Sequence, residues 1–363
     1  MKNKAVLRYF PPSELMEALI NLKCDQALEV IGYSAKNRPI YSLTLGDGAY
    51  KILAWSQMHG NETTTTKASL DLVNHLINTP KGERLLKQLQ LQIIFQLSPD
   101  GASRYTRLNA NEVDLNRDAV AQSQPEMKAL IKAYKTFNPD LCLNLHGQRT
   151  IFSSGATNKP ATVSFLAPAA NDARAITPAR LVAMQYIAAM AKNLPVEDHW
   201  GIGRYDDAFN INCTGDYFTA QNTPTILFEA GHYPEDYNRD KTRDLIFSSL
   251  LTCLNCAVNQ SYTDFSFEDY AAIPDNGNHL RDVEIQNITI VNNANITTSS
   301  LFVQYKEVLK EGAIHLIPEY AGNEDKLKGL KIINALNKNQ TDPINIVESS
   351  EKILNHLQSF IDI

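Results

Sequence analysis

The chain has 363 residues, of which 44% are hydrophobic and 20% charged, which is typical of a globular protein long enough for a full core and a second, smaller domain. Its formal net charge of −6 argues against binding nucleic acid through the phosphates. No apolar stretch reaches the ~18 residues of a membrane span, and no long apolar segment follows Met1 as in a secretion signal, so we expect a cytoplasmic location.

Short apolar runs alternate with amphipathic stretches over residues 1 to about 258. The expected strands lie at residues 51–56, 93–97, 141–145 and 225–228, and the expected helices at residues 64–77, 125–137, 178–192 and 245–257. This alternation predicts an α/β fold in which helices cover a sheet. Cys253 and Cys256 lie in the last of these helices, and we interpret them as buried thiols because no second close cysteine pair completes a zinc ribbon.

The composition changes after residue 258 to runs rich in β-branched residues that alternate as strands do. Expected strands lie at residues 283–291, 300–305 and 313–317, and a last helix at residues 348–360. We therefore divide the chain into a catalytic domain, residues 1–258, and a small β-rich C-terminal domain, residues 259–363.

Two histidines and a glutamate stand where the first and third of these strands end. His59 and Glu62 belong to a His-Gly-Asn-Glu turn between a strand and a helix, and His146 closes the apolar run 141–145. Zinc favours imidazole and carboxylate ligands, and open α/β sheets place ligands beyond the carboxyl ends of their strands. The alternative is an ordinary polar turn and a core histidine, because His-x-x-Glu alone is a weak motif.

Further segments support the metal site. They are Ile31 to Ile40, Ser98-Pro99-Asp100-Gly101, Arg107 to Arg117 (RLNANEVDLNR) and the strand that carries Glu229. In this order, and with His59, Glu62 and His146, they resemble the zinc metallocarboxypeptidase family, the relatives of carboxypeptidases A and B. Asn37 stands where that family usually has glycine. The resemblance extends to about residue 257 and implies a mixed, eight-stranded sheet between helices.

The resemblance also implies the role of each site residue. His59, Glu62 and His146 would bind one zinc ion per chain, and Glu229 would act as general base and then general acid. Arg107 would stabilise the oxyanion, and Asn116 with Arg117 would hold the free carboxylate of the substrate. These roles describe a metallopeptidase that hydrolyses the C-terminal bond of a peptide. Without the resemblance, Arg117 could equally form surface salt bridges with Asp114 and Asp118.

The residues that contact the substrate side chain are less well defined. Many family members place a tyrosine over the substrate; Tyr205 and Tyr217 are in range, and Phe209 could fall at the matched position instead. We prefer Tyr205, because a polar, glycine-containing neighbourhood indicates a loop that can close. Residues 199–218 should line the specificity pocket, where three aspartates favour a polar or basic substrate: Asp206, Asp207 and Asp216. His232 could also line the site.

The C-terminal domain keeps an alternative open. Deacylases of the aspartoacylase and succinylglutamate desuccinylase type are similar in their metal motif and Asn-Arg pair, and carry a β domain that narrows the site for small N-acyl amino acids. The RLNANEVDLNR segment is closer to the peptidases. Peptides recycled from cell walls are further candidate substrates. A metal-free binding module would not require Glu229 and Arg107 beside three intact ligands. The sequence does not predict the oligomeric state.

Overall fold

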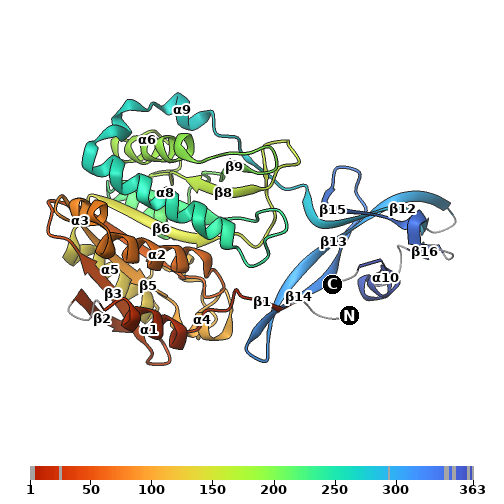
Figure 1. Cartoon of the computed structure of the whole chain (residues 1–363), viewed down its shortest axis with the longest axis horizontal. Helices are drawn as coiled ribbons and strands as arrows, with labels where there is room; N and C mark the ends of the chain where they lie inside the picture. The colour runs from red at the N-terminus through yellow and green to blue at the C-terminus, as the bar shows by residue number, and fades with distance from the viewer. Residues whose placement is uncertain are drawn as a thin grey trace.

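A computed structural model describes residues 5–23, 27–292, 295–338, 343–345, 349–357 and 360–361. Its larger part is built on an eight-stranded sheet with the strand order β2-β3-β5-β4-β6-β10-β8-β9 (Figure 1). The strands are β2 (Leu28–Tyr33), β3 (Pro39–Leu45), β4 (Tyr50–Ser56), β5 (Leu89–Phe95), β6 (Leu141–Gly147), β8 (Ala161–Leu166), β9 (Gly201–Arg204) and β10 (Thr225–Ala230). The four strands expected in this part are present as β4, β5, β6 and β10.

The sheet is mixed, as expected from the family resemblance. Its centre is parallel, because β4 pairs in parallel with both β5 and β6, and β6 with β10. On the two flanks, β3 runs antiparallel to β5 and β8 antiparallel to β10. The carboxyl ends of β4, β6 and β10 therefore meet at one edge of the sheet. The candidate metal ligands lie at this edge, since His59 and Glu62 follow β4 and His146 is near the end of β6.

Helices cover both faces of this sheet. The main helices are α1 (Pro12–Asn21), α2 (Thr64–Asn78), α3 (Pro80–Leu86), α4 (Pro99–Arg104), α5 (Pro125–Phe137), α6 (Pro178–Asn193), α7 (Thr214–Ala220), α8 (Asp240–Asn259) and α9 (Phe267–Ala271). Alternate residues of β4 enter two separate cores. Ile52 and Ala54 pack with α2, α6 and α8, whereas Leu53 and Trp55 pack with α5 and α7. Burial on both faces explains why the central strands are continuous apolar runs.

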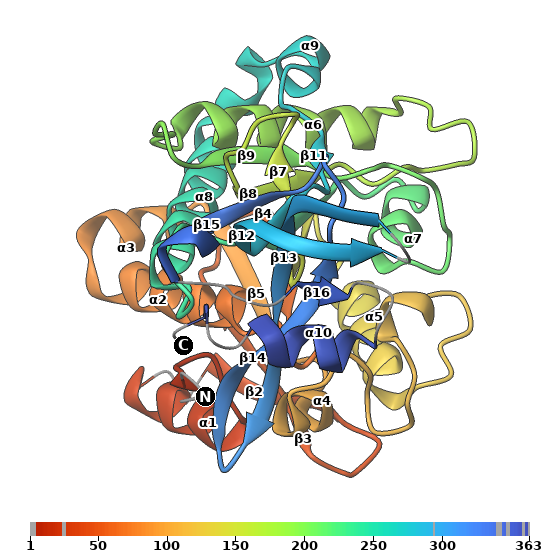
Figure 2. The same ribbon diagram turned by 90° about the vertical axis from the view of Figure 1, so that its right-hand side faces the viewer.

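A second sheet holds the C-terminal part of the chain, to the right in Figure 1 and facing the viewer in Figure 2. Its order is β1-β14-β13-β12-β15, and β16 pairs with β12. The strands are β1 (Ala5–Val6), β12 (Leu280–Asn292), β13 (Asn295–Lys310), β14 (Ala313–Gly322), β15 (Lys328–Asn334) and β16 (Ile344–Asn345). This is the β-rich region that the sequence predicts, with the N-terminal strand β1 added to its edge.

The C-terminal helix is α10 (Ser350–Leu357), whose Ile353 and Leu357 enter the core of the second sheet. Residues 348, 358 and 359 of the expected helix lie outside the described residues. Between α8 and β12 the chain forms α9, which packs against α6, and β11 (Asn276–Gly277), which pairs with β7 (Ser153–Ser154). The domain boundary at residue 258 stays a prediction. None of the described helices is long and apolar enough to cross a lipid bilayer.

Candidate active site

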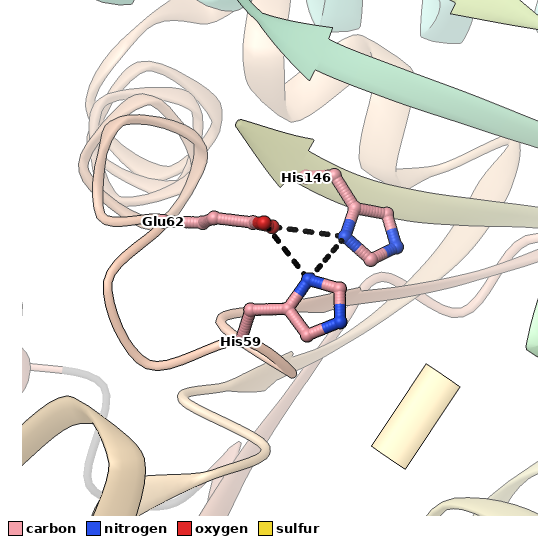
Figure 3. A group of neighbouring side chains, drawn as sticks. All are labelled: His59, Glu62 and His146. Carbon is pink, nitrogen blue, oxygen red and sulfur yellow. Dashed lines mark hydrogen bonds and ion pairs between the residues drawn. The ribbon is translucent and has the colours of Figure 1, made fainter. Parts of the chain in front are cut away.

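Two imidazoles and a carboxylate converge at the carboxyl ends of β4 and β6 (Figure 3). Nδ1 of His59 lies 2.8 Å from Oε1 of Glu62 and 3.2 Å from Nδ1 of His146. The same nitrogen of His146 lies 2.9 Å from Oε2 of Glu62. All three side chains are buried, and their ligand atoms lie within 4.8 Å of one another. The structure thus brings together the three residues that the sequence predicts as metal ligands.

This donor set fits zinc. Bonds of about 2.0–2.2 Å to a tetrahedral ion separate neighbouring ligand atoms by about 3.3 Å, a few tenths of an ångström more than the separations here. Burial acts to raise the pKa of Glu62, but the two imidazoles outweigh it and hold the pKa below its usual value, so the carboxylate is ionised. His59 Nε2–H donates to Oδ1 of Asp114 at 3.0 Å, which leaves Nδ1 free to bind a metal.

Gly60 explains how the turn between β4 and α2 presents its two ligands. A Cβ atom at Gly60 would lie 1.9 Å from the carbonyl carbon of Gly101, so only glycine lets the turn pack on the Pro99-Asp100-Gly101 segment. The helix that follows is held to β6, because the buried hydroxyl of Thr65 donates to the carbonyl of Leu145 at 3.2 Å. The Ser-Pro-Asp-Gly motif therefore packs against the turn that carries His59 and Glu62 and supports the candidate metal site.

The upstream motif, residues 31–40, supports the same segment. Oδ2 of Asp100 accepts a hydrogen bond of 3.0 Å from the backbone N–H of Lys36, and Arg38 forms an ion pair with this buried carboxylate. Asn37 has a φ of 59°. Left-handed backbone favours glycine and, among other residues, asparagine, which is the physical reason why Asn37 can replace the usual glycine.

Asn109 organises the loop that carries the candidate catalytic arginine. Its buried amide accepts from the backbone N–H groups of Asn111 and Val113 and donates to Gln124. Arg107 is thereby placed so that Nε and Nη2 contact Oδ2 of Asp114 at 3.1 and 3.0 Å. Its Nη1 lies 3.7 Å from Oε1 of Glu62, so the guanidinium borders the metal ligands.

The predicted carboxylate clamp lies on the same loop. Oδ1 of the buried Asn116 accepts from the backbone N–H of Thr214 at 2.9 Å, which joins the loop to the start of α7. Arg117 is exposed, and its Nη1 contacts the carbonyl of Asn116 at 2.7 Å and Sγ of Cys213 at 3.1 Å. No carboxylate in the described part of the chain pairs with Arg117, so the salt bridges that formed the alternative interpretation are absent there.

Glu229 stands beside His146, because β10 and β6 pair in register at these two residues. Its Oε2 is buried without a hydrogen-bond partner among the described residues. Burial, followed by the charge of nearby Glu62, raises the pKa of Glu229 well above its usual range. A buried carboxylate whose Oε2 has no partner among the described residues, beside a candidate metal ligand, is suited to accept and return a proton.

Tyr205 is the candidate tyrosine that the structure places at this site. It lines the same cavity as the metal ligands, Glu229 and Arg117, whereas Phe209 and Tyr217 do not. The ring of Tyr217 packs on Phe218 instead. The backbone N–H of Tyr205 donates to the carbonyl of Phe165 at 3.0 Å, so this residue continues the edge of the sheet rather than belonging to the free loop expected from the sequence.

The cavity has a volume of about 500 Å³, and a row of side chains across three strands forms part of its wall. Asn144, Leu227 and Leu166 are register partners on β6, β10 and β8. Asn144 lies two residues before His146, and Leu227 two residues before Glu229, so both face the same side of the sheet as these site residues. Leu166 faces that side as well, because it pairs with Leu227. Asn144 is buried, and neither atom of its amide has a hydrogen-bond partner among the described residues.

Two of the three candidate aspartates reach this cavity. Asp206 lines it in an exposed position, and Asp216 lines it as a buried residue whose pKa is raised by burial to about 6. Asp207 instead pairs with Arg174 and Arg180. His232 is not one of the described residues that line the cavity. Its ring packs against Tyr237 instead.

Several residues of the site were not predicted as such, and three of them have an evident role. Asp114 orients His59, Asn144 faces the cavity, and Arg149 lines its wall. The position of Asn144, two residues before His146 on a strand, was a usable signal. The sequence contains no such signal for Arg149, because its partners Tyr305 and Glu307 lie more than 150 residues away in the chain. Apart from that support, no described residue of the C-terminal sheet lines the cavity.

Comparisons with known proteins agree with this geometry. A family model described as "Zinc carboxypeptidase" matches residues 14–220. The chain is 29% identical over 137 residues to carboxypeptidase SOL1 of Arabidopsis thaliana, and 26% identical over 115 residues to a probable carboxypeptidase 2 of Arthroderma benhamiae. These matches span 32% and 31% of this chain, but only 28% and 21% of the two relatives.

Solved structures share the fold. A metallo-carboxypeptidase from Burkholderia cenocepacia matches with a TM-score of 0.56 and 18% identity, over 69% of this chain and 70% of its own. A metallo-carboxypeptidase from Pseudomonas aeruginosa, in complex with (2-guanidinoethylmercapto)succinic acid, matches with a TM-score of 0.56 and 20% identity, over 70% of each chain. The family model covers more than half of the sequence, and the chain therefore belongs to the zinc carboxypeptidase family.

Proposed function

We propose that this protein is a metallocarboxypeptidase that removes single residues from the carboxyl end of peptides. The observation that carries the proposal is one cavity that combines a candidate metal-ligand cluster, the guanidinium of Arg117 and the carboxylate of Glu229, whose Oε2 has no partner among the described residues. An arginine without a carboxylate partner, close to a hydrolytic centre, is suited to hold the free carboxylate of a substrate. That contact would select the last peptide bond of a chain.

Each task of the reaction has a candidate residue. Bound by His59, Glu62 and His146, zinc would supply a Lewis acid that polarises the scissile carbonyl and lowers the pKa of a water molecule. Glu229 would take a proton from the attacking water at Oε2 and return it to the leaving amine. Arg107 would stabilise the negative charge that develops on the carbonyl oxygen. Tyr205 would donate a hydrogen bond to the substrate, because burial raises the pKa of its phenol and keeps it protonated.

The cavity favours a polar or basic side chain on the terminal residue. The amide of Asn144 is buried and has no partner among the described residues, and Asp216 lines the same cavity. A buried polar group without a partner costs about 1–3 kcal/mol, which a hydrogen bond from the substrate would recover. Leu166 and Leu227 would contact the apolar stem of such a side chain.

Incubation of the zinc-loaded protein with a peptide library and a panel of N-acyl amino acids, followed by mass spectrometry, tests the function. We expect stepwise loss of single C-terminal residues, and loss of that activity when the terminal carboxylate is amidated. Cell-wall peptides belong in the panel, because the cavity does not exclude them. Turnover of acyl amino acids alone would contradict the proposal. One zinc ion per chain and a cytoplasmic location stay predictions.

A further inference from the structure

Two cationic side chains of the cavity are held by different parts of the molecule. Arg117 of the carboxylate clamp contacts Cys213, the residue before α7, and its neighbour Asn116 contacts Thr214 in α7. Arg149 follows the metal ligand His146 by three residues, yet it is held by β13 of the C-terminal sheet. A peptide whose terminal carboxylate occupies Arg117 would therefore leave Arg149 available to a second group of the same substrate.

Arg149 is anchored but not saturated. Its Nη1 donates to Oε1 of Glu307 at 3.0 Å, and its Nη2 to the carbonyl of Tyr305 at 2.9 Å. These two bonds use two of the five N–H donors of the guanidinium, and the other three have no hydrogen-bond partner among the described residues. The side chain of Arg149 is 34% exposed, whereas that of Glu307 is only 2% exposed. Glu307, which anchors the guanidinium, is thus buried, whereas Arg149 itself lines the cavity and is partly exposed.

Glu307 does not belong to Arg149 alone. Glu307 also pairs with the buried Arg8, and its Oε2 accepts the hydroxyl hydrogen of Tyr105 at 2.7 Å. One carboxylate therefore serves two guanidinium groups, while Asp282 and Glu319 act on Arg149 without an ion pair to it. Burial and the neighbouring Arg8 lower the pKa of Arg149 to about 10, so that it stays charged at neutral pH.

We propose that Arg149 binds a carboxylate that the substrate carries on the amino-terminal side of the scissile bond, so that the enzyme prefers peptides with an acidic residue in one of the two positions before the last. The planar guanidinium fork suits a carboxylate better than a neutral amide. Glu307 of β13 is a positioning residue, because it holds the guanidinium of Arg149 in place. Through this contact the C-terminal sheet contributes to substrate selection. The inference rests on the proposed carboxypeptidase function.

Matched peptides test this inference. The zinc-loaded full chain is given acetylated tetrapeptides that end in the same residue and differ only by Glu or Gln in one of the two preceding positions. At one position we expect kcat/KM to favour the Glu peptide about tenfold or more, mainly through KM, as for a charge-assisted hydrogen bond. Arg149→Gln should lower kcat/KM for the Glu peptide until the ratio is close to one, and Arg149→Lys should give an intermediate ratio.

Arg243→Gln is the matched control, because Arg243 is 35% exposed and pairs with Asp71 outside the cavity. It should keep the wild-type ratio. Folding of Arg149→Gln is checked by its unfolding midpoint, which we expect to stay close to wild type since Glu307 keeps Arg8 as a partner. A wild-type ratio close to one at both positions, or an unchanged ratio in Arg149→Gln, would overturn the inference.

If no peptide is cleaved, the proposed function fails, and the affinities of the same peptides for the zinc-loaded protein decide the inference separately. Calorimetry should then show about tenfold tighter binding of the Glu peptide, lost in Arg149→Gln. Equal affinities of the two peptides would refute the role of Arg149.

Discussion

Replacement of Glu307 by glutamine tests how strongly the C-terminal sheet is joined to the catalytic sheet. Its carboxylate is 2% exposed and pairs with Arg8, whose side chain is 5% exposed, as well as with Arg149. Loss of one partner from a buried ion pair costs about 3–5 kcal/mol, because the remaining charge stays buried. Glutamine retains an acceptor for one hydrogen bond, so we expect a loss of about 3 kcal/mol, most of it from Arg8.

Urea unfolding of the zinc-loaded protein at pH 7, followed by circular dichroism, measures this loss. Glu319→Gln is the control on the neighbouring strand β14. Glu319 also pairs with a cation, Lys306 at 3.3 Å, but both side chains are more than half exposed. An exposed pair contributes about 0–1 kcal/mol, so this variant should unfold close to wild type. Equal unfolding midpoints for the two variants would refute the argument that Glu307 holds a buried cationic cluster.

Three further predictions concern the active site. Gly60→Ala would place Cβ 1.9 Å from the Gly101 carbonyl carbon and should weaken zinc binding at least about tenfold in a chelator competition. Gly312→Ala strains the β13–β14 turn, where φ is 77°, but its methyl group meets nothing within 4 Å, so zinc affinity should stay unchanged. Asp216 has a pKa raised by burial to about 6, so it is neutral below that pH and charged above it. The kcat/KM ratio for peptides ending in Lys and in Leu should therefore rise as pH increases from 5 to 8; Asp216→Asn should abolish the rise, and a flat wild-type ratio would exclude the contact. Tyr205→Phe should lower kcat/KM by about tenfold with zinc retained, whereas Tyr217→Phe should not; equal effects of the two changes would contradict the assignment of Tyr205.

The central strands could be predicted because both of their faces are buried. β4, β6 and β10 are continuous apolar runs that end at or next to site residues. β8 is also buried, but Thr162 and Ser164 interrupt its apolar run, because their hydroxyls donate to His232 and Asn276. β2 is a half-exposed edge strand, and β9 has only four residues, two of them glycine. Neither gives a clear strand signal.

The candidate site was predictable where residue type, order and spacing carry the chemistry. His59, Glu62, His146, Arg107, Asn116, Arg117 and Glu229 all line one cavity, as the family resemblance implies. The surroundings were less predictable, since they depend on contacts between distant segments. Asp207 could not be separated from Asp206 and Asp216 by sequence, because its partners Arg174 and Arg180 come from another element. Arg149 could not be found at all without the fold of the C-terminal sheet.

The central claim is that His59, Glu62 and His146 bind the metal while Glu229 performs the proton transfer without binding it. Zinc content and peptidase activity, measured together for wild type, Glu62→Ala and Glu229→Gln, test this division most directly. We predict about one zinc ion per chain in wild type and in Glu229→Gln, loss of zinc in Glu62→Ala, and loss of activity in both variants. Full zinc content in Glu62→Ala, or substantial activity in Glu229→Gln, would contradict the account.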